Sequence, residues 1–313
     1  MNSTVTNDQA VSGKLALAQA LQLPSREAML SRDSSVSQFW LQNKQLLSDA
    51  WREWEQAQQG ELLSPDDTLL DSNLRCAVEA AWDDPSKEIA VEELWKQVSP
   101  GVFQCQFFNP ERLGELREYL NKVQEANIPL RPPYGIALNR FGAMLDKRSE
   151  GYLAAPEFQH FYNQLLDKYV RPVARLLFPE IIGFDSQTFG FSIQYQPGID
   201  TSLQLHSDAS AATLNVNLNM PGETFSGSEV DFYDPDSGKV NRLTFAPGTA
   251  MIHRGAIAHA AQPITAGKRT NFVLWLYGDR MQLPSDWRSA TTSLSARERW
   301  TLPSAPKDEH APF

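Results

Sequence analysis

Three residues in the second half of the sequence could together hold a transition-metal ion. His206 and Asp208 stand two positions apart, and His259 follows about fifty residues later. In a β-strand, side chains at positions i and i+2 point to the same face, so this imidazole and this carboxylate would converge. Two histidines and one carboxylate leave half of an octahedron open, which suits the oxygen chemistry of iron(II). A His-x-Asp tripeptide alone is more typical of a hydrogen-bonded structural pair.

Arg269 follows His259 by ten residues and could anchor an anionic ligand beside that metal. A buried guanidinium requires a partner, and no acidic residue stands near Arg269 in the sequence. A bound dicarboxylate would supply one, because the guanidinium fork matches the geometry of a carboxylate. The ten-residue spacing also favours His259 over His253 as the distal ligand, which leaves His253 beside the site or in the core. Trp275 is expected in the core.

The residues from 188 onward show the alternating pattern of β-strands, and these strands must position the candidate ligands. Apolar and polar residues alternate with the period of a β-strand, and turn residues separate the segments. Eight short strands at this spacing predict a sandwich or a small barrel. One of them would present Thr213, Asn215, Asn217 and Asn219 on a single polar face, toward solvent or toward a pocket. The expected strands are Phe189–Gln196, Leu203–His206, Thr213–Asn219, Glu229–Tyr233, Val240–Phe245, Thr249–His253, Ile257–Gln262 and Thr270–Tyr277.

The first half of the chain has a mostly helical pattern. Aromatic and aliphatic residues recur at helical spacing between Phe39 and Trp54, and packing onto the main domain is favoured over a binding groove. A second helical region is expected from about Asn73 to Val98, with an interruption at Asp83-Asp84-Pro85. The other expected elements are a strand over Val102–Phe108, a helix beginning at Asn109, a short strand over Tyr134–Leu138, and a helix beginning at Pro156 that Pro172 bends or restarts.

Composition limits the classes of partner and compartment. The 313 residues carry a formal net charge of -10 without a basic stripe, which disfavours nucleic acid and anionic membranes as partners. No apolar run approaches the roughly 20 residues that span a bilayer, and no signal-peptide core is recognisable. The two cysteines, Cys76 and Cys105, are too few for a disulfide framework. We therefore expect a soluble, cytoplasmic protein, and we assign no oligomeric state. His310, in the polar tail, is expected to be inert.

The combined motifs resemble a known family of enzymes. Tyr195-Gln-Pro-Gly198, His206-x-Asp208, His259 and Arg269 together resemble the iron(II)- and 2-oxoglutarate-dependent dioxygenases of the prolyl and lysyl hydroxylase type. The closest likeness is to the 2-oxoglutarate-oxygenase-domain-containing proteins of plants and animals, through residues 206–218, 225–232 and 253–260. The likeness covers roughly residues 99 to 278 and is densest after residue 188.

The resemblance implies a fold and a set of cofactors. The fold would be α+β, a double-stranded β-helix (a jelly-roll, cupin-like barrel) flanked by helices. Iron(II) would be held by His206, Asp208 and His259, and Arg269 would grip the distal carboxylate of 2-oxoglutarate. O2 would be the second co-substrate, with ascorbate as an accessory reductant.

The resemblance also suggests roles for three less certain positions. Tyr195, through its hydroxyl, and Asn215 are further candidates for contact with 2-oxoglutarate. Ser228 stands where many members have the second glycine of a Gly-Gly-Glu motif, so we expect a slightly altered turn. Halogenases of this superfamily lack the carboxylate of Asp208, so its presence here implies hydroxylation.

The expected function is hydroxylation of an unactivated C–H bond, with release of succinate and CO2. The substrate would be a protein side chain (a peptide) or a small metabolite. One alternative is a non-catalytic double-stranded β-helix that binds a ligand through Arg269, and another is a zinc hydrolase, for which no motif positions a general-base Glu. The expected organisation is a mostly helical N-terminal extension over residues 1–98, a dioxygenase domain over 99–278 with its β-helix core at about 188–278, and a tail over 279–313.

Overall fold

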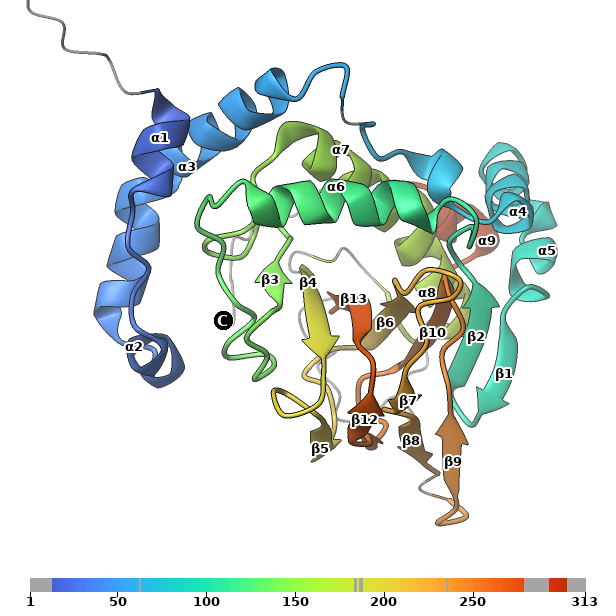
Figure 1. Cartoon of the computed structure of the whole chain (residues 1–313). Helices are drawn as coiled ribbons and strands as arrows, with labels where there is room; N and C mark the ends of the chain where they lie inside the picture. Colours follow the sequence, from blue (N-terminus) through green and yellow to red (C-terminus); the bar gives the residue numbers. More distant parts are fainter. Residues whose placement is uncertain are drawn as a thin grey trace, which may run out of the picture.

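Two antiparallel sheets form the centre of the molecule (Figure 1). The computed structural model describes residues 13–61, 63–182, 185, 188–234, 236–278 and 293–302. The large sheet has the strand order β1-β2-β10-β6-β13-β4-β3, the small sheet has the order β5-β11-β8-β9, and β12 pairs separately with β7. In chain order the strands are β1 (Lys96–Ser99), β2 (Val102–Gln106), β3 (Ala143–Met144), β4 (Thr188–Tyr195), β5 (Leu203–His206), β6 (Ala212–Asn217), β7 (Ser226–Gly227), β8 (Val230–Tyr233), β9 (Val240–Leu243), β10 (Thr249–Arg254), β11 (His259–Ala261), β12 (Ile264–Ala266) and β13 (Arg269–Leu276).

The chain passes back and forth between the two sheets as it runs from β4 to β13. β4, β6, β10 and β13 lie in the large sheet, whereas β5, β8, β9 and β11 lie in the small sheet. This connectivity is that of a double-stranded β-helix, or jelly roll. All eight strands expected from the alternating pattern are present, and the predicted α+β class and jelly-roll fold are confirmed.

Successive side chains of each strand in the large sheet point to two different environments, the helical layer and the cavity between the sheets. Leu214 and Leu274 are cross-strand partners whose side chains join a buried cluster with helix residues such as Phe161. Thr213 and Trp275, the next pair along, face the cavity between the sheets instead. Helices therefore cover one face of the large sheet, and the other face is free to build a site (Figure 1). The helices are α1 (Lys14–Gln19), α2 (Arg26–Ser31), α3 (Ser34–Ala57), η1 (Asp67–Leu69), α4 (Ser72–Asp83), η2 (Pro85–Lys87), α5 (Ile89–Glu92), α6 (Leu113–Glu125), α7 (Pro156–Gln164), η3 (Leu165–Val170), α8 (Arg171–Leu177) and α9 (Ala296–Arg299).

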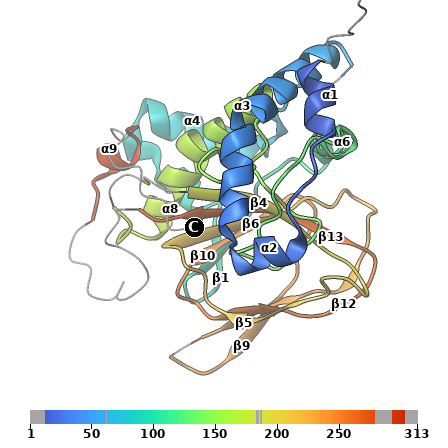
Figure 2. The same ribbon diagram turned by 90° about the vertical axis from the view of Figure 1, so that its left-hand side faces the viewer.

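The long helix α3 packs its aromatic face onto the rest of the molecule. Asp33 caps the helix by accepting a hydrogen bond from the backbone N–H of Ser35 at 2.8 Å. Trp40, Trp51 and Trp54 are all at most 4% exposed and belong to the same cluster as the outer face of the large sheet. The expectation that this aromatic helix packs onto the main domain is confirmed. α3 crosses in front of the sheets when the molecule is viewed from that side (Figure 2).

The α-helix restarts at Pro172, as expected. α7, the π-helical stretch η3 and α8 follow one another without a break, and Pro172 lies at the beginning of α8. A proline removes one backbone donor and crowds the preceding turn. The wider π turn directly before Pro172 changes the hydrogen-bond spacing at this point, which is how the chain continues as a helix.

Two expectations from the sequence are wrong. Lys96–Ser99 is a strand rather than the end of a helix, because Pro100 and Gly101, the latter with φ of +68°, make a tight turn that pairs β1 with β2. Residues 134–138 form a turn rather than a strand, because Gly135 has φ of +99° and the N–H of Ile136 bonds back to Pro133 at 3.0 Å. β3 supplies the edge strand instead.

The helix expected from Asn109 begins slightly later, at Leu113. The side chain of Asn109 accepts a hydrogen bond from the N–H of Glu111 at 3.0 Å, and its carbonyl accepts bonds from Arg112 and Leu113. Asn109 therefore initiates a turn that leads into α6 rather than capping the helix directly.

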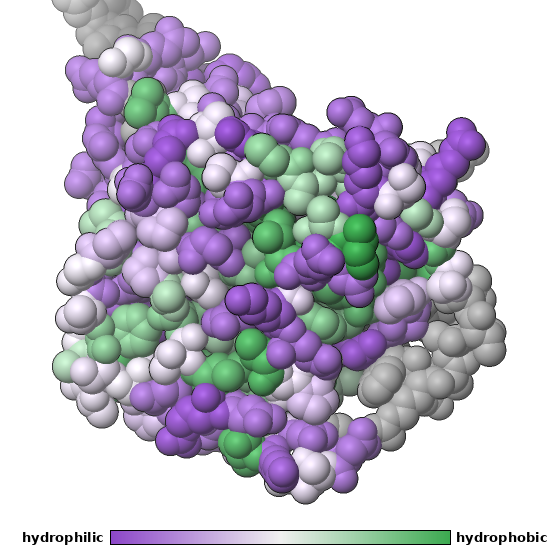
Figure 3. Space-filling view, turned by 90° about the vertical axis from the view of Figure 1, so that its right-hand side faces the viewer, coloured by the Kyte–Doolittle hydropathy of each residue, from purple (hydrophilic) through white to green (hydrophobic). Residues whose placement is uncertain are grey.

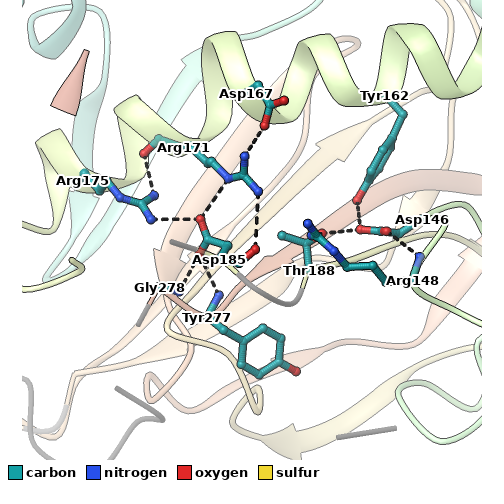
Figure 4. Close-up of polar contacts among 10 residues, drawn as sticks. All are labelled: Asp146, Arg148, Tyr162, Asp167, Arg171, Arg175, Asp185, Thr188, Tyr277 and Gly278. Carbon is teal, nitrogen blue, oxygen red and sulfur yellow. Dashed lines mark hydrogen bonds and ion pairs between the residues drawn. The ribbon is translucent and has the colours of Figure 1, made fainter. Parts of the chain in front are cut away.

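A buried ion cluster joins the helical layer to the end of β13 (Figure 4). Asp185 accepts hydrogen bonds from Arg171 Nε at 3.1 Å and from Arg175 Nη2 at 2.9 Å. Its other oxygen accepts the backbone N–H groups of Tyr277, at 3.2 Å, and Gly278, at 2.5 Å. Burial alone would raise the pKa of Asp185, but the charges of the two arginines outweigh burial and lower the pKa.

The surface carries both polar and apolar groups. On the face shown in Figure 3, hydrophilic side chains predominate and hydrophobic ones form small groups between them. Within the part of the chain that the structure describes, no helix combines the length and apolar character needed to cross a membrane.

Candidate metal centre and its pocket

The fold brings the three predicted metal ligands together. His206 ends β5 and His259 begins β11, and the two residues are register partners in the small sheet. Asp208 follows His206 in the loop that leads to β6. One ligand atom from each residue lies within 4.8 Å of the other two. His206 Nε2 lies 3.4 Å from Asp208 Oδ1, and His259 Nε2 lies 3.8 Å from Asp208 Oδ2.

Both histidines are oriented by their own backbone. Nδ1 of His206 faces the carbonyl of Gln204 at 2.6 Å, and Nδ1 of His259 faces the carbonyl of Ile257 at 2.9 Å. A proton on Nδ1 satisfies each carbonyl, and Nε2 of each ring then faces the carboxylate. This is the arrangement found in metal-binding histidines, because a bond to one ring nitrogen sets the tautomer of the other.

Asp208 is held as an anion. Thr213 Oγ1 donates to Asp208 Oδ2 at 2.6 Å, and the backbone N–H of Asp208 donates to Gly255 O at 2.9 Å. Burial would raise the pKa of this carboxyl, but the neighbouring imidazoles of His206 and His259 and the hydrogen bond from Thr213 outweigh burial and lower the pKa to about 2. The carboxylate is therefore ionised throughout the physiological range.

The imidazole of His259 is kept neutral. Burial, together with the nearby His253, lowers the pKa of His259 to about 4. A neutral imidazole is the form that can donate its lone pair to a metal ion. Burial likewise lowers the pKa of His253.

His253 lies beside the site, as expected from the spacing. It is 2% exposed, and its Nε2 lies 3.9 Å from Asp208 Oδ2. Its Nδ1 faces the carbonyl of Arg254 at 2.9 Å, and its ring packs against that of His259 with centroids 4.6 Å apart. The three groups within 4.8 Å of one another nevertheless come from His206, Asp208 and His259.

Arg269 lies deep between the sheets with no carboxylate beside it. Its side chain is 1% exposed, and Nη1 donates to the carbonyl of Ser228. The guanidinium lies over the rings of Tyr195, at 4.7 Å, and Phe245, at 5.3 Å. No acidic group of the described chain lies within ion-pair distance of Arg269, and burial lowers its pKa. A cation in such a position requires an anionic partner from outside the chain.

Several buried polar atoms around Arg269 have no hydrogen-bond partner. Within the described residues these are Arg269 Nε, Ser228 Oγ, Asn217 Nδ2 and Asn271 Oδ1. Leaving a buried donor or acceptor unpaired costs about 1–3 kcal/mol. Of these four residues, Arg269 lines the cavity between the sheets, and the geometry of its guanidinium matches a carboxylate.

One cavity connects the triad with the arginine. It leaves about 50 Å³ accessible to the centre of a water molecule. Its walls include the triad residues and Arg269, together with Ile136 and Ala137 from the loop before β3. The remaining lining residues are Phe191, Ile193, Tyr195, Leu203, Thr213, Asn215, Val230, Ala261, Val273 and Trp275.

Tyr195 and Asn215 both reach this cavity. Tyr195 is the register partner of Arg269 and is 5% exposed. Asn215 is half-buried on the polar face of β6, and its Oδ1 accepts a hydrogen bond from Asn271 Nδ2 at 2.5 Å. Trp275 is 6% exposed and forms part of the wall.

Sequence reasoning noted Ser228 only as an altered turn and missed Gly255, and both residues shape the site. Ser228 has φ of +60°, and its carbonyl receives the guanidinium of Arg269. The difference from Gly-Gly-Glu was a signal, because a second glycine suits this left-handed conformation. Gly255 lies so close to the backbone of Ser210 that any Cβ would collide with it. Gly255 thereby allows the approach of two loops on which Asp208 depends, and only the tertiary fold shows this.

The chain is similar in sequence to several known proteins. No family model matches the chain. A 2-oxoglutarate and iron-dependent oxygenase domain-containing protein, ICU11 of Arabidopsis thaliana, is 30% identical over 191 residues, which cover 56% of this chain and 45% of the relative. The 2-oxoglutarate and iron-dependent oxygenase domain-containing protein 2 of Xenopus tropicalis is 32% identical over 187 residues, which cover 56% and 48%.

The chain is a homologue of these oxygenase-domain proteins. It spans about half the length of the curated relatives it matches. Among solved structures, prolyl 4-hydroxylases from Phytophthora capsici align at 16% identity with a TM-score of 0.45, covering 72% of this chain and 76% of that one.

Proposed function

We propose that this protein is an iron(II)- and 2-oxoglutarate-dependent dioxygenase that hydroxylates an unactivated C–H bond. The observation that carries the proposal is Arg269, a buried cation to which the described residues offer no acidic partner. It lies at one end of a cavity whose other end holds two histidines and a carboxylate. The homology to oxygenase-domain proteins supports it. A non-catalytic binding protein would have no use for all three ligand groups, which disfavours that alternative.

The residues present fit iron(II) and 2-oxoglutarate. His206, Asp208 and His259 offer a mixed nitrogen and oxygen donor set that suits non-haem iron(II). Arg269, which lines the cavity, would bind the distal carboxylate of 2-oxoglutarate. When bound, the metal and co-substrate would supply oxidative chemistry that consumes O2, releases succinate and CO2, and inserts one oxygen atom into the substrate.

The protein's own groups contribute position, charge and exclusion of water. Thr213 fixes the carboxylate of Asp208 through its 2.6 Å hydrogen bond, so the carboxylate does not have to reorient on binding. Tyr195 stacks on Arg269 and limits the positions of the guanidinium. Val273 and Trp275 form an apolar wall that keeps bulk water away from the reacting groups. We include Tyr195 and Asn215 as proposed contacts of the co-substrate.

The test is spectroscopic and does not require the substrate. Adding 2-oxoglutarate to the anaerobic iron(II) protein should produce a weak visible charge-transfer band. Asp208→Ala should abolish the band, whereas Asp234→Ala, which lies outside the cavity, changes the net charge equally and should retain it. Absence of the band from the wild-type protein would reject the dioxygenase proposal. A succinate-release screen across amino acids, peptides and metabolites, with mass detection of one added oxygen, then identifies the substrate.

We further propose a substrate that is either a peptide side chain or a small metabolite, and a cytoplasmic setting. Two free thiols, exposed Cys76 and buried Cys105, are in keeping with a reducing compartment. We assign catalysis to residues 99–278 and a supporting role to the helices before them. β1 runs across that boundary, and the clusters shared with α3 make the helical region a structural support for the barrel.

A further inference from the structure

The carboxylate of Asp208 is connected to a chain of two buried hydroxyl groups. Thr213 Oγ1 donates a hydrogen bond to Asp208 Oδ2 at 2.6 Å, and Ser210 Oγ lies 2.9 Å from the same Thr213 oxygen. Ser210 is 0% exposed, Thr213 2% and Asp208 5%, so all three residues are shielded from solvent. Thr213 and Asp208 line the cavity of the metal centre, whereas Ser210 does not. Ser210 therefore reaches the site only through another side chain.

The order of protons along this chain follows from the chemistry of its carboxylate end. An ionised carboxylate can only accept, so the proton of the Thr213 hydroxyl is directed at Asp208. A hydroxyl has a single proton, and Thr213 Oγ1 must therefore accept in its contact with Ser210, which donates. Hydrogen bonds that run in one direction through a buried site polarise and strengthen one another. Ser210 thus strengthens the bond that Thr213 makes to Asp208.

The backbone of Gly255 holds Ser210 at the start of this chain. A Cβ on Gly255 would collide with both the carbonyl oxygen and the hydroxyl oxygen of Ser210, so the two residues are in direct contact. The carbonyl of Gly255 accepts the N–H of Asp208 at 2.9 Å, and the N–H of Gly255 donates to the carbonyl of Ala211 at 3.1 Å. One glycine therefore fixes the segment from Asp208 to Ala211 at both ends, with Ser210 between them.

The imidazoles near Asp208 Oδ2 do not replace the hydroxyl donor. His259 Nε2 lies 3.8 Å and His253 Nε2 lies 3.9 Å from Oδ2. In both rings Nδ1 faces a backbone carbonyl at 2.9 Å, so the neutral ring carries its proton there and has a lone pair at Nε2. A lone pair cannot donate a hydrogen bond to a carboxylate oxygen. Of the described residues, Thr213 therefore supplies the hydrogen bond that fixes Oδ2.

Fixing Oδ2 also fixes the orientation of the other carboxylate oxygen. Oδ1 lies 3.4 Å from His206 Nε2, on the side of the carboxylate that faces this ligand. A carboxylate that was free to rotate would lose that freedom when a metal ion bound, and the lost entropy would weaken binding. Groups that hold a ligand in place before the ion arrives therefore raise metal affinity.

We propose that Ser210 is a positioning residue of the metal centre, acting on the carboxylate of Asp208 through the hydroxyl of Thr213. The role of Ser210 rests on the proposed function, because the metal centre is part of that function. Its effect reaches the carboxylate through two hydrogen bonds that run in one direction. The affinity of the protein for iron(II) should therefore depend on a residue that is neither a ligand nor part of the cavity wall.

The test measures the iron(II) affinity of the intact protein under anaerobic conditions, by competition with a coloured chelator. Thr213→Val keeps the shape of the side chain without its hydroxyl and should weaken iron(II) binding about ten- to hundredfold. Ser210→Ala should weaken it about three- to tenfold, because the bond from Thr213 remains but loses its support. Thr213→Ser retains a hydroxyl and should bind within about threefold of the wild type. The matched control, Ser149→Ala, removes a buried hydroxyl outside the cavity and should leave the affinity unchanged.

The double variant Ser210→Ala/Thr213→Val distinguishes an effect through Thr213 from a purely structural role. If Ser210 acts through Thr213, its replacement should change iron(II) affinity by less than about twofold once that hydroxyl is absent. If Ser210 serves only the fold, Ser210→Ala should lower the melting temperature of the metal-free protein and leave iron(II) affinity unchanged. An unchanged affinity in Ser210→Ala, or a full additional loss in the double variant, would overturn the proposal.

The wild-type protein separates this result from a failure of the proposed function. If the wild type binds iron(II) and gives the charge-transfer band with 2-oxoglutarate, the function stands, and the variants then decide the role of Ser210 alone. At saturating iron(II), Ser210→Ala should still give the band, because all three ligands are present. A wild-type protein that bound no iron(II) would overturn both the proposed function and the role of Ser210.

Discussion

Arg269→Met tests whether this arginine serves a ligand or the fold. Met fills much of the same volume without charge and leaves Tyr195 and Phe245 in contact with an apolar chain. If Arg269 exists to bind 2-oxoglutarate, its removal should abolish that binding while the free protein keeps its stability. If Arg269 is structural, its removal should instead lower the free energy of unfolding of the ligand-free protein.

The magnitude follows from the contacts of Arg269. Losing its hydrogen bond to Ser228 costs about 1.5–3 kcal/mol, and losing the stacking on Tyr195 costs about 0.5–2 kcal/mol. Removing a buried charge that has no acidic partner returns several kcal/mol of desolvation energy. These contributions nearly cancel, so the free energy of unfolding of the ligand-free protein should change by less than about 2 kcal/mol.

Co-substrate binding should respond quite differently. Removing one partner of a buried charge pair costs about 2–5 kcal/mol, which corresponds to a roughly thirtyfold to several-thousandfold loss of 2-oxoglutarate affinity. Urea unfolding with 2-oxoglutarate at a hundred times its dissociation constant should stabilise the wild type by about 2.7 kcal/mol, and this gain should vanish in Arg269→Met. Iron(II) affinity should stay within about threefold, because Arg269 is not among the triad ligands.

Arg175→Met is the matched contrast. Arg175 is also buried, at 4% exposure, but it is paired with Asp185 at 2.9 Å. Its replacement removes one of the two arginines that pair with the buried carboxylate of Asp185 and should destabilise the free protein by about 3 kcal/mol. The reasoning is refuted if Arg269→Met destabilises as much as Arg175→Met, or if it binds 2-oxoglutarate within about threefold of the wild type.

Two further outcomes follow from buried polar groups. Ser228→Gly should raise the free energy of unfolding by about 1 kcal/mol, because it relieves a left-handed residue at φ of +60° and removes an unpaired hydroxyl, while 2-oxoglutarate affinity measured by calorimetry should weaken a few-fold. An unchanged or lower stability would contradict the assigned strain. The folded pKa of Asp185 lies below its unfolded value, so its stabilisation is present above about pH 4 and is lost as the pH falls through the folded pKa. Asp185→Asn should therefore lower the urea midpoint strongly at pH 7 and progressively less as the pH falls below about 4, and a difference that did not shrink in acid would rule this out.

The sequence predicts the barrel well because each strand can be recognised from its own short segment of sequence. Each alternating segment is bounded by glycine, proline or aspartate turns, so Leu203–His206 could be recognised without knowledge of its neighbours. The spacing of His206 and Asp208, and the step from His259 to Arg269, also lie within short stretches of chain. The structure brings each of these residues to the cavity at which the sequence placed them.

Features that depend on distant backbone could not be predicted in this way. The close approach of Gly255 to Ser210 and the capture of Arg269 by the carbonyl of Ser228 join segments that the sequence does not relate. Residues 134–138 show the opposite error, because their apolar pattern suggests a strand, but two prolines and the positive φ of Gly135 turn the chain instead. That turn places Ile136 in the cavity wall. The apolar residues of this segment therefore line the site from a turn and do not form a strand.

The carboxylate of Asp185 also has a kinetic consequence for the end of β13. The last amides of a strand normally exchange with solvent quickly, because their partners fray. Here the N–H groups of Tyr277 and Gly278 are bound to a fully buried side chain that two helix arginines hold in place. Their exchange therefore requires α8 and β13 to separate, so these amides should exchange as slowly as those in the middle of the sheet. The strand that carries Arg269 at its beginning is thus locked at its other end to the helical layer.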